Sequence, residues 1–247
     1  MYGVKHVLSF DCADKTLGIC LLSYLPSEII NEHVSIIENE LNIQNKTKQT
    51  IQLINNILTV KGVWLFDLLP GLVVRDTEDA IRLSRLKYAL KSVRKIIESA
   101  HIKLNRIIIE YQMGANDLSR LISSAINYEF VDCDPNIKIN MGYLPNGSII
   151  DPQTDNLSAS NFLSIGPSFK NSFHFASYLS YSTFAAKYRT TTTANKHHTA
   201  ENFKYWLELQ AIANPQYAFN LKTKHSEINH VADAFMQAVY WIVNNEL

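Results

Sequence analysis

The sequence contains little cysteine, glycine or proline and no long hydrophobic run. Three cysteines, Cys12, Cys20 and Cys133, occur in 247 residues without a Cys-X-X-Cys pair, which argues against a disulfide framework and a zinc ribbon. No apolar run approaches the roughly 18 residues that span a bilayer. Asp11 and Asp14 near the start do not fit a secretory signal. We expect a soluble, intracellular protein with no membrane partner.

The chain also lacks an excess of either charge. Lys and Arg number 23, as do Asp and Glu, and 47% of residues are hydrophobic, so a disordered chain is excluded. The equal totals do not mean that the charges are evenly distributed along the chain. Residues 169–225 hold seven basic and two acidic residues, whereas residues 129–156 hold five acidic residues and one lysine. A neutral total therefore does not exclude a polyanionic partner bound on one face.

Hydrophobic periodicity predicts an α/β sheet flanked by helices. Two short strands joined by a polar turn at 13–16 predict an N-terminal β-hairpin. The polar, Pro- and Gly-containing stretch 132–158 is interpreted as a surface excursion. The expected strands cover residues 5–11, 17–24, 106–110 and 162–165, with 34–37 and 60–66 less regular, and the expected helices cover residues 77–100, 117–128, 199–212 and 227–245.

Three carboxylates fall where a hydrophobic core would not place them. Asp11 and Glu110 end apolar strands, and Asp233 lies in the last helix, on a polar line that runs from His230 to Gln237 beside the apolar stripe. A buried carboxylate is costly unless it is paired or binds a metal. Each residue alone is more often a turn, cap or solvated residue. Together, if neighbouring strands bring them to one point, they predict a site for Mg²⁺ or Mn²⁺.

Three ordered motifs resemble those of the RuvC-like Holliday junction resolvases, most of all the poxvirus-type branch of large DNA viruses. The motifs are Ser9–Gly18 (SFDCADKTLG), Ile107–Gln112 (IIIEYQ) and His230–Phe235 (HVADAF). The resemblance implies a ribonuclease-H-like fold, a mixed five-stranded sheet flanked by helices, in a single nuclease domain over residues 1–247. Residues of about 25–75 and 128–160 match the family poorly and are expected to be insertions.

The resemblance also implies a structure-selective endonuclease that resolves four-way DNA junctions by two-metal hydrolysis. Asp11, Glu110 and Asp233 would hold two Mg²⁺ or Mn²⁺ ions. His230 stands where the family often has a second acidic residue, and it is interpreted as a metal ligand, a proton carrier or a support for the ligands. Gln112 would line the site and touch a phosphate, although an ordinary strand-end role is equally open.

The symmetry of a four-way junction implies a homodimer, for which the 117–128 helix is a candidate interface. If the protein is viral, we expect it in the host-cell cytoplasm or a replication factory.

A basic, hydroxyl-rich stretch before the 199–212 helix is the candidate DNA-binding surface. A solvated hydrophilic loop remains an alternative. The aromatic run 173–184 fits core packing better than base stacking, and a zinc site at the two adjacent histidines lacks further ligands. The candidate DNA-binding residues are Lys187, Arg189, Lys196, His197, His198 and Lys204.

Two other functions remain open. The segment Asp11–Gly18 loosely resembles the phosphate loop of actin-like and sugar-kinase ATPases, but it lacks the expected glycines and no second phosphate loop is visible. Alternatively, the chain is a non-catalytic DNA-binding or structural protein whose carboxylates no longer act.

Overall fold

The computed structural model of the chain describes residues 4–13, 15–25, 58–72, 79–110, 117–131, 142–143, 149–150, 162–165, 171, 173–213 and 225–245. Its centre is a mixed five-stranded sheet in the order β3-β2-β1-β4-β7. Two further short strands, β5 (Gly142–Tyr143) and β6 (Ile149–Ile150), pair with each other. The prediction of a mixed α/β sheet flanked by helices is confirmed.

The antiparallel half of the sheet comes from three consecutive strands. β1 (Lys5–Cys12) and β2 (Thr16–Tyr24) form the predicted hairpin. β3 (Leu58–Asp67) adds to β2 with a register shift between Leu21 and Leu22. Gln210 covers the bulge, because its side chain bonds both the amide and the carbonyl of Val60. Residues 58–67 therefore belong to the sheet, although they lie within the range that was expected to be an insertion.

The parallel half continues from β1 to two later strands. β4 (Arg106–Glu110) pairs with β1, and β7 (Phe162–Ile165) pairs with β4, both in parallel. The short apolar run of β4 suits its position between two parallel neighbours. Because the carboxyl ends of parallel strands meet at one edge of a sheet, the last residues of β1 and β4 lie next to each other.

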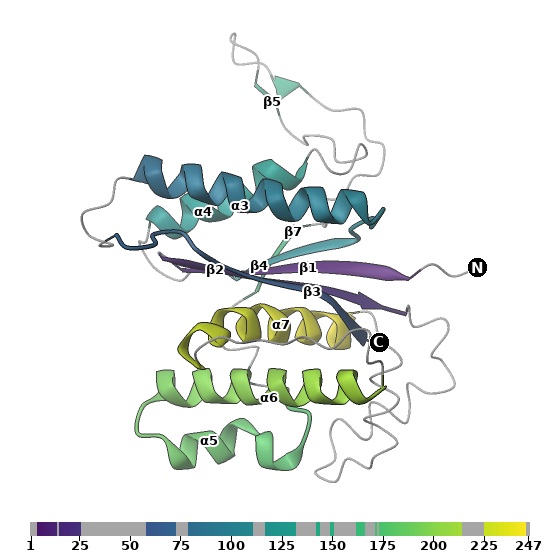
Figure 1. The fold of residues 1–247 in the computed structure, drawn as a ribbon, viewed down its shortest axis with the longest axis vertical. Coiled ribbons are helices and arrows are strands. Elements are labelled where there is room, and N and C mark those ends of the chain that lie inside the picture. Colours follow the sequence, from purple (N-terminus) through teal and green to yellow (C-terminus); the bar gives the residue numbers. More distant parts are fainter. Residues whose placement is uncertain are drawn as a thin grey trace.

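Helices cover both faces of the sheet (Figure 1). α3 (Asp79–Ser99) and α4 (Asp117–Val131) lie on one face. α7 (His225–Asn245) lies on the other, followed outward by α6 (Thr191–Ala213) and then α5 (Tyr181–Lys187), which a 3₁₀ turn at Ser177–Leu179 precedes. The predicted helices 77–100, 117–128 and 227–245 are confirmed. Among the described residues, no helix has the length and hydropathy needed to cross a membrane.

Strand alternation divides the hydrophobic core in two. Leu8, Phe10 and Ile109 face α3 and α4, whereas Val7 and Ile108 face α7. The aromatic run before α6 contributes to the second core, since the Phe175 ring contacts Phe173 edge-on and lies tilted against Trp206 and Phe235. The expectation of core packing is confirmed for Phe173, Phe175 and Phe184, whereas Tyr178 of the same run is 60% exposed.

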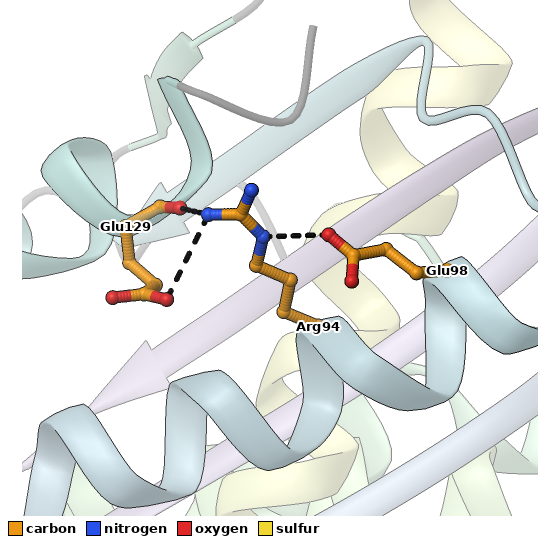
Figure 2. Close-up of polar contacts among 3 residues, drawn as sticks. All are labelled: Arg94, Glu98 and Glu129. Carbon is orange, nitrogen blue, oxygen red and sulfur yellow. Dashed lines mark hydrogen bonds and ion pairs between the residues drawn. The ribbon is translucent and has the colours of Figure 1, made fainter.

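One arginine ties the two helices of the α3/α4 face together (Figure 2). Arg94 of α3 donates from Nε to Glu98 Oε1 at 2.8 Å and from Nη1 to the backbone oxygen of Glu129 at 3.0 Å. Its Nη1 also lies 3.8 Å from Glu129 Oε1. The guanidinium thus satisfies a carbonyl in the last turn of α4, where no intrahelical donor remains.

The start of α6 differs from its prediction. The helix begins at Thr191, eight residues before the expected start at 199, so most of the predicted basic loop is helical. Thr190 caps it, because its Oγ1 accepts from the Thr193 amide at 3.2 Å. The threonine run masked this start, since β-branched residues are weak helix formers. The irregular strand at 34–37 and Gln112 lie outside the described residues.

Candidate functional site

The site begins with two carboxylates at neighbouring strand ends. Asp11 follows Phe10, which is paired with Ile109, and Glu110 follows Ile109 in the same parallel ladder. Asp11 continues the alternation of Val7 toward α7, and Glu110 continues that of Ile108. They are only 5% and 8% exposed, respectively. The condition set for the metal site, that these two strands are parallel neighbours, is met, and strand alternation sets both acids on one face of the sheet.

A glycine lets α7 approach this point. Gly18 of β2 is the antiparallel partner of Asp11. A Cβ atom at Gly18 would lie 2.3 Å from both the carbonyl carbon and the oxygen of His230 and 2.7 Å from the Val231 nitrogen. Those atoms are helix backbone and cannot rotate away. The absence of a side chain at Gly18 therefore allows the helix backbone to rest on the sheet directly beside Asp11.

The resulting contact joins α7 to β1 through polar groups. His230 Nδ1 lies 2.6 Å from Asp11 Oδ2. Two turns later, Ser9 Oγ donates to Gln237 Oε1 at 3.4 Å, a weak bond that fixes the same pair of elements. Asp233 lies between these contacts on the helix, and its Oδ1 is shielded from solvent. The polar line predicted beside the apolar stripe of α7 thus lies against the strand that carries Asp11.

Both carboxylates also affect Cys12, which lies on the opposite face of β1. Cys12 follows Asp11 and points toward α3 and α4, where it is buried. Desolvation raises the pKa of its thiol well above the ordinary value, and the charges of Asp11 and Glu110 raise it further. Both acids therefore lie close enough to Cys12 to influence its thiol, which remains protonated and unreactive.

The donor set suits a hard divalent cation in its chemistry, although its members are not gathered into a finished metal site. Asp11 and Glu110 offer oxygen ligands from one face, and Asp233 lies one turn beyond His230. Within the described part of the chain, no three His, Cys, Asp or Glu side chains form a group that could hold a metal ion. The structure brings Asp11 and His230 into contact and sets Glu110 at the neighbouring strand end.

Apart from Gln112, the candidate DNA-binding residues lie on α5, on α6 and in the short link between them, beyond α7. Lys187, Arg189 and Lys196 are exposed. His197 stacks on Tyr188 with ring centroids 4.1 Å apart and planes 3° apart. Lys187 Nζ lies 5.5 Å from the centre of the same tyrosine ring. Stacked rings beside cations at the beginning of a helix form a polar surface with both flat and charged groups.

Two of the candidate residues are engaged within the protein. Lys204 Nζ pairs with Glu201 Oε1 at 2.9 Å, one turn earlier on α6. His198 has 0% exposure and lies edge-on to the rings of Tyr181 and Phe184. Desolvation, with a contribution from nearby His174, lowers the pKa of His198 to about 4. The assignment of His198 to DNA contact is wrong, because a side chain enclosed in the α5/α6 core cannot reach a phosphate.

Comparisons with known proteins give a limited likeness. No protein-family model and no curated protein matches the chain. Among solved structures, Thermus thermophilus RuvC is similar with a TM-score of 0.43 and 6% identity, over 97% of this chain and 96% of that chain. T. thermophilus RuvC in complex with a Holliday junction substrate is similar with a TM-score of 0.44 and 7% identity, over 98% and 97%. At these values the likeness establishes neither family nor activity.

Proposed function

We propose that this protein is a metal-dependent endonuclease that hydrolyses phosphodiester bonds in branched DNA and resolves four-way junctions. The observation that carries the proposal is the pair of nearly buried carboxylates, Asp11 and Glu110, at adjacent parallel strand ends. Two like charges held this close and out of water oppose folding by several kcal/mol unless cations compensate them. Their position matches the acidic motifs that resemble those of the RuvC-like resolvases.

Asp11, Glu110 and Asp233 would hold the cations, Mg²⁺ or Mn²⁺ and two per site, with His230 as the fourth member. Bound divalent ions would activate water and stabilise charge on the leaving oxygen of the phosphodiester. Hard oxygen donors of this kind suit such ions better than they suit zinc.

The protein side chains would orient and support this chemistry. His230 holds Asp11 Oδ2 through Nδ1 and thereby fixes the direction of that carboxylate, as partners of metal ligands commonly do. Its imidazole is partly exposed, so it borders the solvent side of the strand ends. Gln112, two residues after Glu110, would line the same site on the side of the substrate phosphate.

DNA would reach the site along α5 and α6. The cations Lys187, Arg189 and Lys196 would contact backbone phosphates, with His197 and Lys204 beside them. Figure 1 shows that β1 ends, and α6 and α7 begin, at the same end of the molecule. A basic surface and the acidic strand ends therefore share one end of the fold. Symmetric cleavage of a junction requires two such sites, and hence a homodimer.

One observation favours a non-catalytic alternative, a DNA-binding protein without nuclease activity. Asp11 already contacts His230, and no metal-binding group of three side chains is assembled in the described residues. In that protein the basic surface would bind DNA, and divalent cations would neither stabilise the fold nor support cleavage.

The decisive assay incubates the purified protein with a synthetic four-way junction and Mg²⁺. We expect paired, symmetric nicks that disappear in Asp11→Asn and in Glu110→Gln, with rates at least about a hundredfold lower. Asp67→Asn is the matched control, since this acid also ends a strand but is solvent-exposed and lies near Lys15. Unchanged cleavage in both site variants would disprove the assigned site, and binding without cleavage by the wild type would favour the alternative.

A further inference from the structure

The outward face of α3 carries a straight line of lysines. Lys87, Lys91 and Lys95 follow one another at intervals of four residues, and all three are exposed. Residues four apart on a helix lie on the same face about one turn from each other. These three residues, called the lysine ridge, therefore form a row about 12 Å long at 1.5 Å per residue.

The arginines of the same helix have different surroundings. Arg82 pairs with Asp79 at 2.7 Å, Arg85 donates to the Leu68 carbonyl at 3.2 Å, and Arg94 joins α3 to α4. The lysine ridge, by contrast, makes no ion pair with any residue in the described part of the chain. The three arginines therefore make contacts within the protein, whereas the lysines of the ridge form no ion pair among the described residues.

Such a row weakens the isolated helix. Like charges four residues apart repel each other by a few tenths of a kcal/mol per pair. α3 holds six basic residues and two acidic ones, and Asp79 and Glu98 both pair with arginines. An anionic partner would offset this repulsion. Duplex DNA carries one charge per about 1.7 Å of axis, so about seven phosphates lie along the length of the ridge.

We propose that the lysine ridge is a second DNA-binding surface, which holds a duplex arm of the branched substrate by its phosphates. The inference rests on the proposed function for the identity of the polyanion. The ridge lies on the opposite side of the sheet from α5 and α6, and α3 begins at the end where β1 ends (Figure 1). Two basic surfaces on opposite faces suit a substrate whose arms diverge from the strand ends.

The chemistry of the ridge favours nucleic acid over an anionic membrane. A helix that lies on a membrane inserts an apolar face, but the apolar face of α3, with Leu86, Leu90 and Val93, is buried against the sheet. Tyr88, which is 76% exposed, is the large ring beside the ridge. An exposed ring among cations can also stack on an unpaired base near a branch point.

The test measures binding of the full chain to a four-way junction with long duplex arms, in EDTA to prevent cleavage, over a range of salt concentrations. Lys87→Gln, Lys91→Gln and Lys95→Gln are combined in one variant, because glutamine keeps a similar helix propensity. We expect binding about tenfold or more weaker in 0.1 M salt, and a log–log salt slope smaller by about 2.7. A junction with arms too short to reach α3 should lose much less.

The matched control removes the same charge elsewhere, by Lys5→Gln, Lys61→Gln and Lys103→Gln, and should keep the wild-type slope. An unchanged slope in the ridge variant, or an equal loss in the control, would overturn the proposal. Binding to phosphatidylserine vesicles is measured in parallel. If the ridge variant binds these vesicles more weakly but binds the junction as the wild type does, the proposal is overturned in favour of a membrane. The wild type could bind the junction but fail to cleave it in the assay with Mg²⁺. If the ridge variant then binds more weakly than the wild type, the ridge proposal is supported and only the nuclease proposal fails.

Discussion

The two faces of the sheet share the same strands and differ in what they bury. Toward α3 and α4, β1 presents Leu8, Phe10 and Cys12, an apolar series that serves packing. Toward α7, it presents Val7, Ser9 and Asp11, and the two polar residues meet Gln237 and His230. Because side chains alternate along a strand, the apolar packing residues of β1 and its polar site residues point to opposite faces of the sheet. A face that accepts buried carboxylates at a cost to stability is the face on which function is expected.

The sharpest contrast between the faces is at consecutive residues, Phe10 and Asp11. Phe10 is fully buried and packs on Phe130 with ring centroids 5.6 Å apart. We expect Phe10→Ala to lower the free energy of unfolding by about 3–5 kcal/mol, through lost burial and the cavity that remains. Urea denaturation measures this loss. The milder Phe10→Leu should keep both the fold and junction cleavage; a Phe10→Leu protein that folds but cannot cleave would break the division between the faces.

On the α7 face, the largest stability effect is predicted at Gly18. Gly18→Ala should cost about 2–3 kcal/mol, because the new Cβ overlaps the backbone of His230 and α7 must move. Gly62→Ala is the comparison, since the three atoms nearest to its Cβ would belong to the Trp64 side chain rather than to backbone. Denaturation should rank Gly18→Ala as the more harmful. Equal losses would show that α7 is not held against the sheet at this point.

Below α7, the buried His198 predicts a dependence of stability on pH. Burial, with a smaller contribution from nearby His174, lowers its pKa to about 4 in the folded protein, against about 6.5 when unfolded. The unfolded chain therefore binds the proton first as the pH falls, and stability is lost from about pH 6.5 down to 4. We expect a loss of about 2 kcal/mol between pH 7 and 5. His198→Phe should remove most of that slope; an undiminished slope would contradict the assignment.

The smallest effect is predicted on the α3/α4 face, at Arg94 (Figure 2). Arg94→Met should lower the free energy of unfolding by about 1–2 kcal/mol, because it leaves the Glu129 carbonyl and carboxylate without the guanidinium. Lys95→Met, next in the chain but exposed, should change stability by less than about 0.5 kcal/mol. Two equal, small changes by thermal unfolding would show that the bridge does not stabilise the helix pair.

Much of this architecture is predictable because it follows from periodicity. The hairpin, β4, β7 and the helices α3, α4 and α7 all show strong alternating or helical patterns. The ends of the Asp11 and Glu110 strands were predictable in the same way, but only the structure shows that these two strands pair. The burial of His198 was not predictable. Its neighbours in the sequence, His197 and Thr199, are polar, and nothing in this threonine-rich stretch indicates that the rings of Tyr181 and Phe184 enclose it.

Other features depend on contacts between distant segments. Gly18 stands in the first acidic motif, but only the approach of α7 explains why a side chain is excluded there. The contact of His230 with Asp11 joins residues 219 positions apart. β3 was indistinct because its bulge reverses the alternation: Val60 faces α7 before it, and Val63 does so after it.

The most direct test of the central claim, that the strand-end carboxylates form a divalent-cation site, is the change in Tm on addition of Mn²⁺. We predict that saturating Mn²⁺ raises the Tm of the wild type, with about 2.7 kcal/mol of stabilisation at 100 times Kd. Most of this shift should be lost in Asp11→Asn and Glu110→Gln, and Asp67→Asn should retain it. In EDTA, Glu110→Gln should melt above the wild type, because one of two adjacent negative charges is removed. An equal Mn²⁺ shift in all four proteins would contradict the account.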